Sequence, residues 1–219
     1  KEFIELLFLD EGINQQTPIA TLRGVNADTL DSILQQIESD VKAGISKFLL
    51  FPVPAKKGTS NFDYSFVTTA IKQIKKTFGN SVWIAPDVCL CAYTTHGHCG
   101  ILDAAGTKVL NDESVKELAG YALQLAQSGA NCIAPSDMMD GRISAIRNIL
   151  DTNRFDDVSI MSYAAKFSSQ FYGPFRDACK STPGDDCNLH NRKTYQASSL
   201  NKNDAVLSTL RDINEGADI

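Results

Sequence analysis

The run Lys47-Phe-Leu-Leu-Phe-Pro-Val53 decides the fold of this chain, because it is almost entirely apolar and is closed by Pro52 and Pro54. Such a short apolar run is typical of a parallel strand buried on both faces. The segment 64–78 has apolar residues at helical spacing, and the segment 82–88 is apolar again. A strand, a helix and a strand are therefore expected in succession. The inward residues of that helix are expected to be Phe66, Val67, Ala70, Ile71 and Ile74.

The same alternation extends along the chain in both directions. Asn26 or Asp28 is the candidate N-cap of a first helix that ends at Gly44, and Asn203 is the candidate N-cap of the last helix. The apolar face of that last helix is expected at Val206, Leu207, Leu210 and Ile213. The further strands are predicted at 3–9, 131–135 and 158–163, and the further helices at 28–43, 113–127, 141–150 and 203–215.

Five strand-helix alternations without a glycine-rich phosphate loop favour a β/α barrel over a dinucleotide-binding fold. The count falls short of the eight strands of a complete barrel. The chain has no internal repeat, low-complexity tract or obvious linker, so a single partial barrel domain is expected over 1–219.

The composition narrows the class of protein. The chain has 219 residues, 43% of them apolar, and a net charge of −5 with scattered basic residues. It can therefore bury a sizeable core, and it lacks the electrostatic footprint of a nucleic-acid or membrane partner. No secretory leader and no apolar stretch of membrane-spanning length are visible. Cytoplasm is the expected location, and a plastid is the alternative if a transit peptide has been removed.

A run of cysteine and histidine, Asp87-Val-Cys-Leu-Cys-Ala-Tyr-Thr-Thr-His-Gly-His-Cys99, carries the strongest chemical signal. Thiolates and imidazoles select zinc, and the absence of a second pair of cysteines favours an open, catalytic metal over a closed structural one. The alternative is a group of inert buried thiols or a disulfide. His96 and His98 are expected to be hydrogen-bond partners rather than ligands. The remaining thiols, Cys132, Cys179 and Cys187, are expected to be free.

Polar residues follow the predicted strands at the end where a barrel carries its active site. Asp87 ends one strand, Ser136 to Arg142 follow the next, and Lys166 follows the strand after that. Desolvation at a barrel mouth would lower the pKa of Lys166, as an imine-forming nucleophile needs. A solvated lysine is the alternative, and Asp137 and Asp140 have their own alternative as turn or helix-capping residues.

Three segments resemble the porphobilinogen synthase family, also called 5-aminolaevulinic acid dehydratase. They are Asp87-Val-Cys-Leu-Cys-Ala-Tyr-Thr-Thr-His-Gly-His-Cys-Gly100, Ala134-Pro-Ser-Asp-Met-Met-Asp-Gly-Arg142 and Met161-Ser-Tyr-Ala-Ala-Lys-Phe-Ser-Ser-Gln-Phe-Tyr-Gly-Pro-Phe-Arg-Asp177. The resemblance implies a (β/α)8 barrel that condenses two 5-aminolaevulinate molecules into porphobilinogen, with loss of water, in tetrapyrrole (haem) biosynthesis. The three cysteines imply the zinc-dependent branch.

The resemblance also assigns roles to individual residues. Lys166 matches the lysine that forms a Schiff base with one substrate molecule, and the segment 180–196 matches a mobile active-site lid. The matching zinc ligands are Cys89, Cys91 and Cys99, the residues near the substrate amine are Asp87 and Ser136, and the carboxylate-binding residues are Arg176, Arg192 and Gln196.

The sequence departs from the family pattern at both ends. The second Schiff-base lysine, in a Met-Val-Lys-Pro-like motif, would lie beyond Ile219, and the N-terminal arm used in assembly is absent or trimmed. Without the second lysine the 219-residue chain is expected to show little or no turnover. As an open partial barrel it is expected to be unstable as a monomer, so a homo-oligomer other than the family's octamer is expected. Ala92 and Glu5 are minor departures.

Two alternative functions stay open at this point. One is a truncated, inactive homologue that binds zinc or pairs with a complete subunit. The other is a class I aldolase that uses Lys166 alone, since a single imine lysine suffices for that chemistry.

Overall fold

The computed structural model describes residues 3–184 and 187–219. In these residues one sheet has the strand order β2-β3-β1-β4-β5-β6-β7, and neighbouring strands are parallel except for the antiparallel pair β2 and β3. The strands are β1 (Glu5–Asp10), β2 (Thr17–Pro18), β3 (Asn26–Asp28), β4 (Lys47–Val53), β5 (Trp83–Val88), β6 (Cys132–Pro135) and β7 (Ser159–Ile160).

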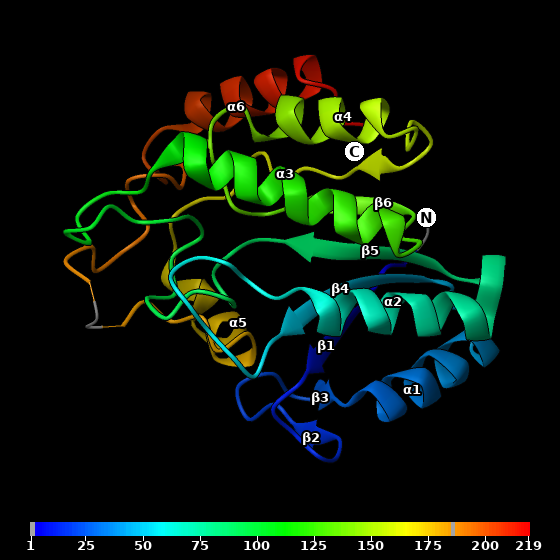
Figure 1. Ribbon diagram of the computed structural model, residues 1–219. Helices are drawn as coiled ribbons and strands as arrows, with labels where there is room; N and C mark the ends of the chain where they lie inside the picture. Colours follow the sequence, from blue (N-terminus) through cyan, green and yellow to red (C-terminus); the bar gives the residue numbers. More distant parts are fainter. Residues whose placement is uncertain (1–2, 185–186) are drawn as a thin grey trace.

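Helices α1 to α4 lie on the outside of the curved sheet, and α5 lies near the carboxyl ends of β4 and β5 (Figure 1). The helices are α1 (Leu30–Lys42), α2 (Ser65–Phe78), α3 (Asn111–Gln127), α4 (Arg142–Thr152), α5 (Gly173–Ala178) and α6 (Lys202–Asn214), with short 3₁₀ helices at Gly79–Ser81 and Gln170–Tyr172. This is the alternation of a β/α barrel in which part of the ring is present.

The strands pack on both faces. Leu7 of β1 and Leu50 of β4 belong to the core that the sheet shares with its outer helices. Phe8 and Phe51 belong to a second cluster on the opposite face, where their rings stack 5.1 Å apart. Phe175 of α5 meets Phe51 edge-on at 4.9 Å. The inner face of the sheet is therefore covered by α5, close to the ends of the strands.

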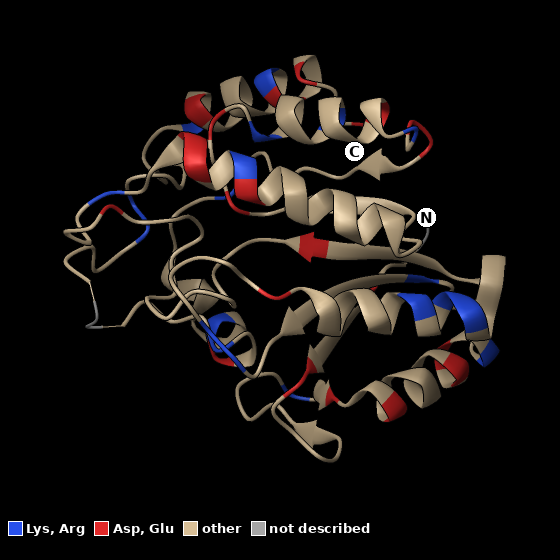
Figure 2. Ribbon diagram, in the orientation of Figure 1, with Lys and Arg blue, Asp and Glu red and all other residues tan. Residues whose placement is uncertain are grey.

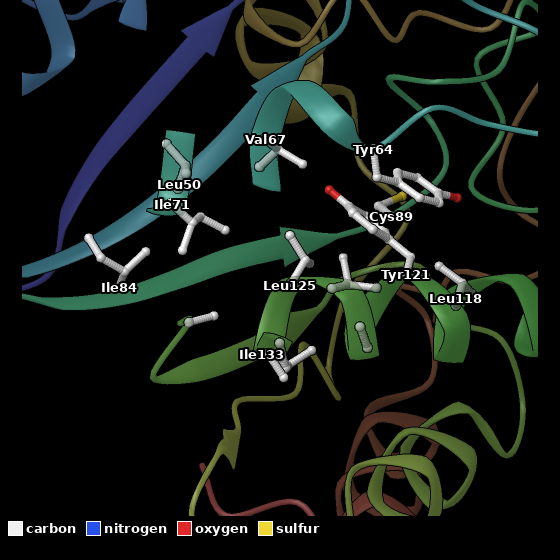
Figure 3. Close-up of a cluster of buried hydrophobic side chains, with 14 of the residues drawn as sticks. Leu50, Tyr64, Val67, Ile71, Ile84, Cys89, Leu118, Tyr121, Leu125 and Ile133 are labelled. Atoms are coloured by element: carbon white, nitrogen blue, oxygen red, sulfur yellow. The ribbon is translucent and has the colours of Figure 1, made fainter. Parts of the chain in front are cut away.

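The outer core runs between the strands and helices α2 and α3. Figure 3 shows Leu50 and Ile84 of the sheet facing Val67, Ile71 and Leu125 of the helices. The same buried cluster includes Cys89, Tyr64 and Tyr121 at the carboxyl ends of the strands. The loop that follows β5 is thus part of the hydrophobic core, and its cysteines are packed among buried side chains.

Charged residues lie mainly on the helices and loops around the sheet (Figure 2). Asp87 is an acidic residue within the sheet, next to the last residue of β5. Among the described residues, no helix is long and apolar enough to cross a membrane.

Several predicted elements differ from the structure. The sheet has seven strands in the described residues, because residues 17–18 and 26–28 form short strands that the sequence does not predict. The strand predicted at 158–163 is reduced to Ser159–Ile160. Asn26 and Asp28 belong to β3, and Thr29 is the N-cap of α1, with its side chain accepting a hydrogen bond from the Ser32 N–H.

Helix α6 is attached to the molecule through its polar face. Its buried residues are Ala205, Ser208 and Asp212, and its N-cap is Asn201 rather than Asn203. Asp212 accepts a 3.0 Å hydrogen bond from Arg142, the first residue of α4, and both side chains are buried. The buried ion pair therefore orients the helix. The predicted apolar face is exposed, with more than half of each side chain accessible at Val206, Leu207, Leu210 and Ile213.

Candidate functional site

The three cysteines of the loop after β5 converge. The sulfur atoms of Cys89, Cys91 and Cys99 all lie within 4.8 Å of one another, and all three residues are buried. A turn brings the loop back, with the Tyr93 and Thr94 N–H groups donating to the Leu90 carbonyl. Gly97, at a φ of 70°, reverses the chain just before Cys99. Local backbone geometry therefore builds the thiol cluster.

The chemistry of this donor set fits a thiophilic cation. Hydrogen bonds from Cys89 and Cys91 lower the pKa of Cys99 well below its ordinary value, while burial raises the pKa of Cys89. The thiols of Cys89 and Cys91 therefore stabilise a thiolate on Cys99 by donating hydrogen bonds to it. A divalent metal would displace those protons and be held by three sulfur ligands, with further coordination positions open.

Neither histidine belongs to this group of ligand atoms in the described residues. His98 is hydrogen-bonded through both ring nitrogens, to Tyr195 at 2.8 Å and to the Leu189 carbonyl at 2.5 Å. His96 accepts from the His98 N–H through Nδ1. Burial lowers the pKa of His96 to about 4, so its imidazole is neutral at pH 7.

Lys166 lies beyond the end of β7 and is buried. Its Nζ donates a 2.6 Å hydrogen bond to the Ser136 carbonyl and lies 5.8 Å from the Tyr163 ring centroid and 5.9 Å from that of Tyr172. The prediction that its pKa is lowered is wrong. Burial does act in that direction, but the electrostatic influence of the neighbouring cysteines, Cys99 foremost, and of Asp87 outweighs it, so the pKa of Lys166 is raised.

One small cavity brings most of the predicted site together. Six of the predicted residues line it, namely Asp87, Cys89, Cys91, Ser136, Lys166 and Arg192. Its volume is only about 20 Å³, so these side chains nearly fill the space that they enclose. Burial raises the pKa of Asp87 to about 7, although the positive charge of Lys166 acts in the opposite direction. Asp87 can therefore exchange a proton near neutral pH.

The three predicted carboxylate-binding residues are placed differently. Arg192 lines the small cavity and donates to the carbonyls of Gly97 (2.8 Å) and Ser181 (2.6 Å). Arg176, on α5, does not line it. Gln196 is buried without a hydrogen-bond partner for either polar atom, and it lines a separate cavity of about 540 Å³. Arg192 therefore lines the same small cavity as the cysteines and the lysine, whereas Arg176 and Gln196 do not.

The structure adds residues that were not among those predicted from the sequence. Tyr172, Phe175 and Cys179 also line the small cavity, and Tyr195 binds the cysteine loop. The first two belong to the segment Phe-Tyr-Gly-Pro-Phe, where their spacing of three on a helical turn is a usable signal. Cys179 and Tyr195 carry no such local signal.

The fold and the site define a class: a β/α-barrel protein with a buried lysine beside a cluster of three thiols. The family model for delta-aminolevulinic acid dehydratase matches residues 1–219. The chain belongs to that family.

Curated relatives agree with this assignment. The chain is 42% identical over 221 residues to the delta-aminolevulinic acid dehydratase of Bacillus subtilis, covering 99% of this chain and 66% of the relative. It is 40% identical over 222 residues to that of Methanothermus sociabilis, covering 100% and 67%. The chain thus spans about two thirds of the length of the curated relatives that it matches.

A solved structure supports the fold. The crystal structure of delta-aminolevulinic acid dehydratase (porphobilinogen synthase) from Toxoplasma gondii ME49, in complex with the reaction product porphobilinogen, superposes with a TM-score of 0.91 at 36% identity. The match covers 98% of this chain and 61% of that chain. The predicted β/α-barrel architecture is thereby confirmed.

Proposed function

We propose that this chain carries the metal-binding and first substrate-binding part of a porphobilinogen synthase, which condenses two 5-aminolaevulinate molecules into porphobilinogen with loss of water. The observation that carries the proposal is the buried Lys166 amine, 2.6 Å from the Ser136 carbonyl, on the wall of a cavity shared with Cys89 and Cys91. Membership of the dehydratase family supports the choice of substrate.

In this proposal Lys166 is the nucleophile. Its neutral amine adds to the ketone carbon of 5-aminolaevulinate, forming a carbon–nitrogen bond, and the ketone oxygen leaves as water with the two amine hydrogens. The amine must first lose a proton, since its pKa is raised. Asp87 is suited to exchange that proton because its pKa is about 7 and it lines the same cavity.

The metal is proposed to be zinc, held by Cys89, Cys91 and Cys99. When bound, zinc supplies Lewis-acid polarisation of a substrate oxygen and offsets the charge of its thiolate ligands. Arg192, whose guanidinium is fixed by the Gly97 and Ser181 carbonyls, is proposed to pair with a substrate carboxylate. Because the cavity is nearly filled, substrate entry requires lining side chains such as Arg192 to move.

The proposal is tested by trapping the imine. The purified, zinc-loaded protein is treated with 5-aminolaevulinate and borohydride, and the modified peptide is identified by mass spectrometry. We expect the adduct on Lys166 and its loss in Lys166→Met. Lys57→Met is the matched control, because Lys57 is a second partly buried lysine whose pKa is lowered by burial.

An adduct on Lys57 with Lys166 unmodified would refute the assignment. Trapping by sugar phosphates rather than by 5-aminolaevulinate would favour the aldolase alternative.

A further inference from the structure

The cysteine loop and the 180–196 segment are joined by a chain of hydrogen bonds whose directions can be assigned. The Leu189 carbonyl can only accept, so the 2.5 Å contact requires a proton on His98 Nε2. In a neutral imidazole Nδ1 is then an acceptor, and the Tyr195 hydroxyl donates to it over 2.8 Å. The Tyr195 oxygen in turn accepts from the backbone N–H of Cys99 at 3.4 Å.

The contact extends along both segments. Arg192 donates to the Gly97 carbonyl, one residue before His98. The backbone of Thr182 lies so close to Gly97 that a Cβ atom there would approach the Thr182 carbonyl oxygen to 2.6 Å. The Tyr195 ring meets His98 edge-on, with centroids 6.0 Å apart. Residues 97–99 are therefore the surface on which the described part of the 180–196 segment rests.

We propose that His98 and Tyr195 are positioning residues that couple metal binding at the cysteines to the placement of the described part of the 180–196 segment, residues 187–196 above all. The inference rests on the proposed function, because it takes Cys99 to be a metal ligand. A metal that ties Cys99 to Cys89 and Cys91 fixes the backbone N–H that Tyr195 binds. It also fixes the neighbouring His98 ring, and through these two groups the positions of Leu189 and Tyr195.

The proposed coupling would connect the metal site to residues that are predicted to bind a substrate carboxylate. Tyr195 is adjacent to Gln196 and lies three residues beyond Arg192, two of the predicted carboxylate-binding residues. Binding at one site that favours a conformation of the other must act reciprocally. A ligand carboxylate that orders the 180–196 segment is therefore expected to tighten metal binding, and metal is expected to slow the opening of that segment.

The test follows the opening of the segment directly. Lys193 and Thr194 are exposed, so trypsin can cleave after Lys193 when the segment opens. Cleavage at this bond is followed by mass spectrometry in the purified protein, with and without a saturating amount of Zn²⁺. Metal binding itself is measured separately with Cd²⁺, through thiolate charge-transfer absorbance.

The matched variants are Tyr195→Phe and Tyr64→Phe. Each removes one hydroxyl with a hydrogen bond, but that of Tyr64 is made to Glu117 and away from the 180–196 segment. We expect Zn²⁺ to slow cleavage after Lys193 by about fivefold or more in the wild type and in Tyr64→Phe, and by less than about twofold in Tyr195→Phe, a range typical of coupling between sites. His98→Gln should behave like Tyr195→Phe.

Two outcomes separate the coupling from the proposed function. Absence of a thiolate–Cd²⁺ band in the wild type would overturn the metal assignment, and the coupling with it. A normal band in every variant, together with equal Zn²⁺ protection in Tyr195→Phe and Tyr64→Phe, would overturn the coupling alone. Far-ultraviolet circular dichroism of each variant shows that the fold is retained.

Discussion

Asp137 is a buried carboxyl group in the loop between β6 and α4. It accepts a 2.8 Å hydrogen bond from the Met139 N–H, and its second oxygen lies 3.5 Å from Nε of Arg142. Burial raises the pKa of Asp137 to about 6, although Arg142 acts in the opposite direction. The folded protein therefore binds this proton more tightly than the unfolded chain, whose aspartates titrate near about 3.9.

This difference predicts a pH dependence of stability. The contribution of Asp137 to the free energy of unfolding is greatest below about pH 4 and falls as the pH rises to about 6, by at most about 3 kcal/mol. In Asp137→Asn this decline should disappear. Urea denaturation of the chelator-treated protein between pH 4 and 7 measures it, with the exposed Asp31→Asn as control. Equal slopes in wild type and Asp137→Asn would contradict the assignment.

A buried ion pair helps to attach helix α6 to α4. The Asp212 carboxylate is shared between Arg142, at 3.0 Å, and the Ser162 hydroxyl, at 2.6 Å. Loss of Asp212 leaves the buried Arg142 guanidinium with only the Asp137 carboxyl, 3.5 Å from its Nε, as a charged partner, and breaking a buried pair costs at most about 3–5 kcal/mol. We expect a loss of up to that size in Asp212→Ala, measured by chemical denaturation, and a much smaller loss in Asp204→Ala on the same helix. If the two losses are similar, α6 is held by other contacts.

The sequence predicts elements best where the signal is local and long. The strand Lys47–Val53 has the predicted bounds because an apolar run and two prolines mark both its character and its end. Strands β2 and β3 are only two and three residues long, which is too short for a period of two to be visible. The exposed face of α6 shows that periodicity gives a helix its apolar face but does not say what that face contacts.

The site residues, too, are predicted best where the sequence signal is local. The three cysteines lie within eleven residues, and a local turn brings their sulfur atoms together as the spacing predicts. The contact between His98 and Tyr195 spans 97 residues, and no local pattern encodes it. The raised pKa of Lys166 was also beyond local reasoning, because it arises from the charges of cysteines that are distant in sequence.

The whole molecule should respond to metal through its stability. A ligand that binds only the folded state at 100 times its Kd adds about 2.7 kcal/mol. For a chain of this size that corresponds to a rise in Tm of about 5–10 °C. We expect this rise with Zn²⁺ in the wild type and in Cys132→Ala, whose thiol lies outside the cluster, but not in Cys99→Ser. Calorimetry provides the measurement, and a full rise in Cys99→Ser would contradict the three-thiol site.

The pairing of Arg142 with Asp212 also bears on the order in which the molecule becomes compact. The two residues are 70 positions apart, so during synthesis on the ribosome the guanidinium emerges long before its carboxylate. Until α6 arrives, the Arg142 guanidinium lacks its 3.0 Å contact with Asp212 and has only the more distant Asp137 carboxyl, 3.5 Å from its Nε, to offset its burial. The α4 region of a nascent chain is therefore expected to stay loosely packed and hydrated, and to condense only when residue 212 leaves the exit tunnel.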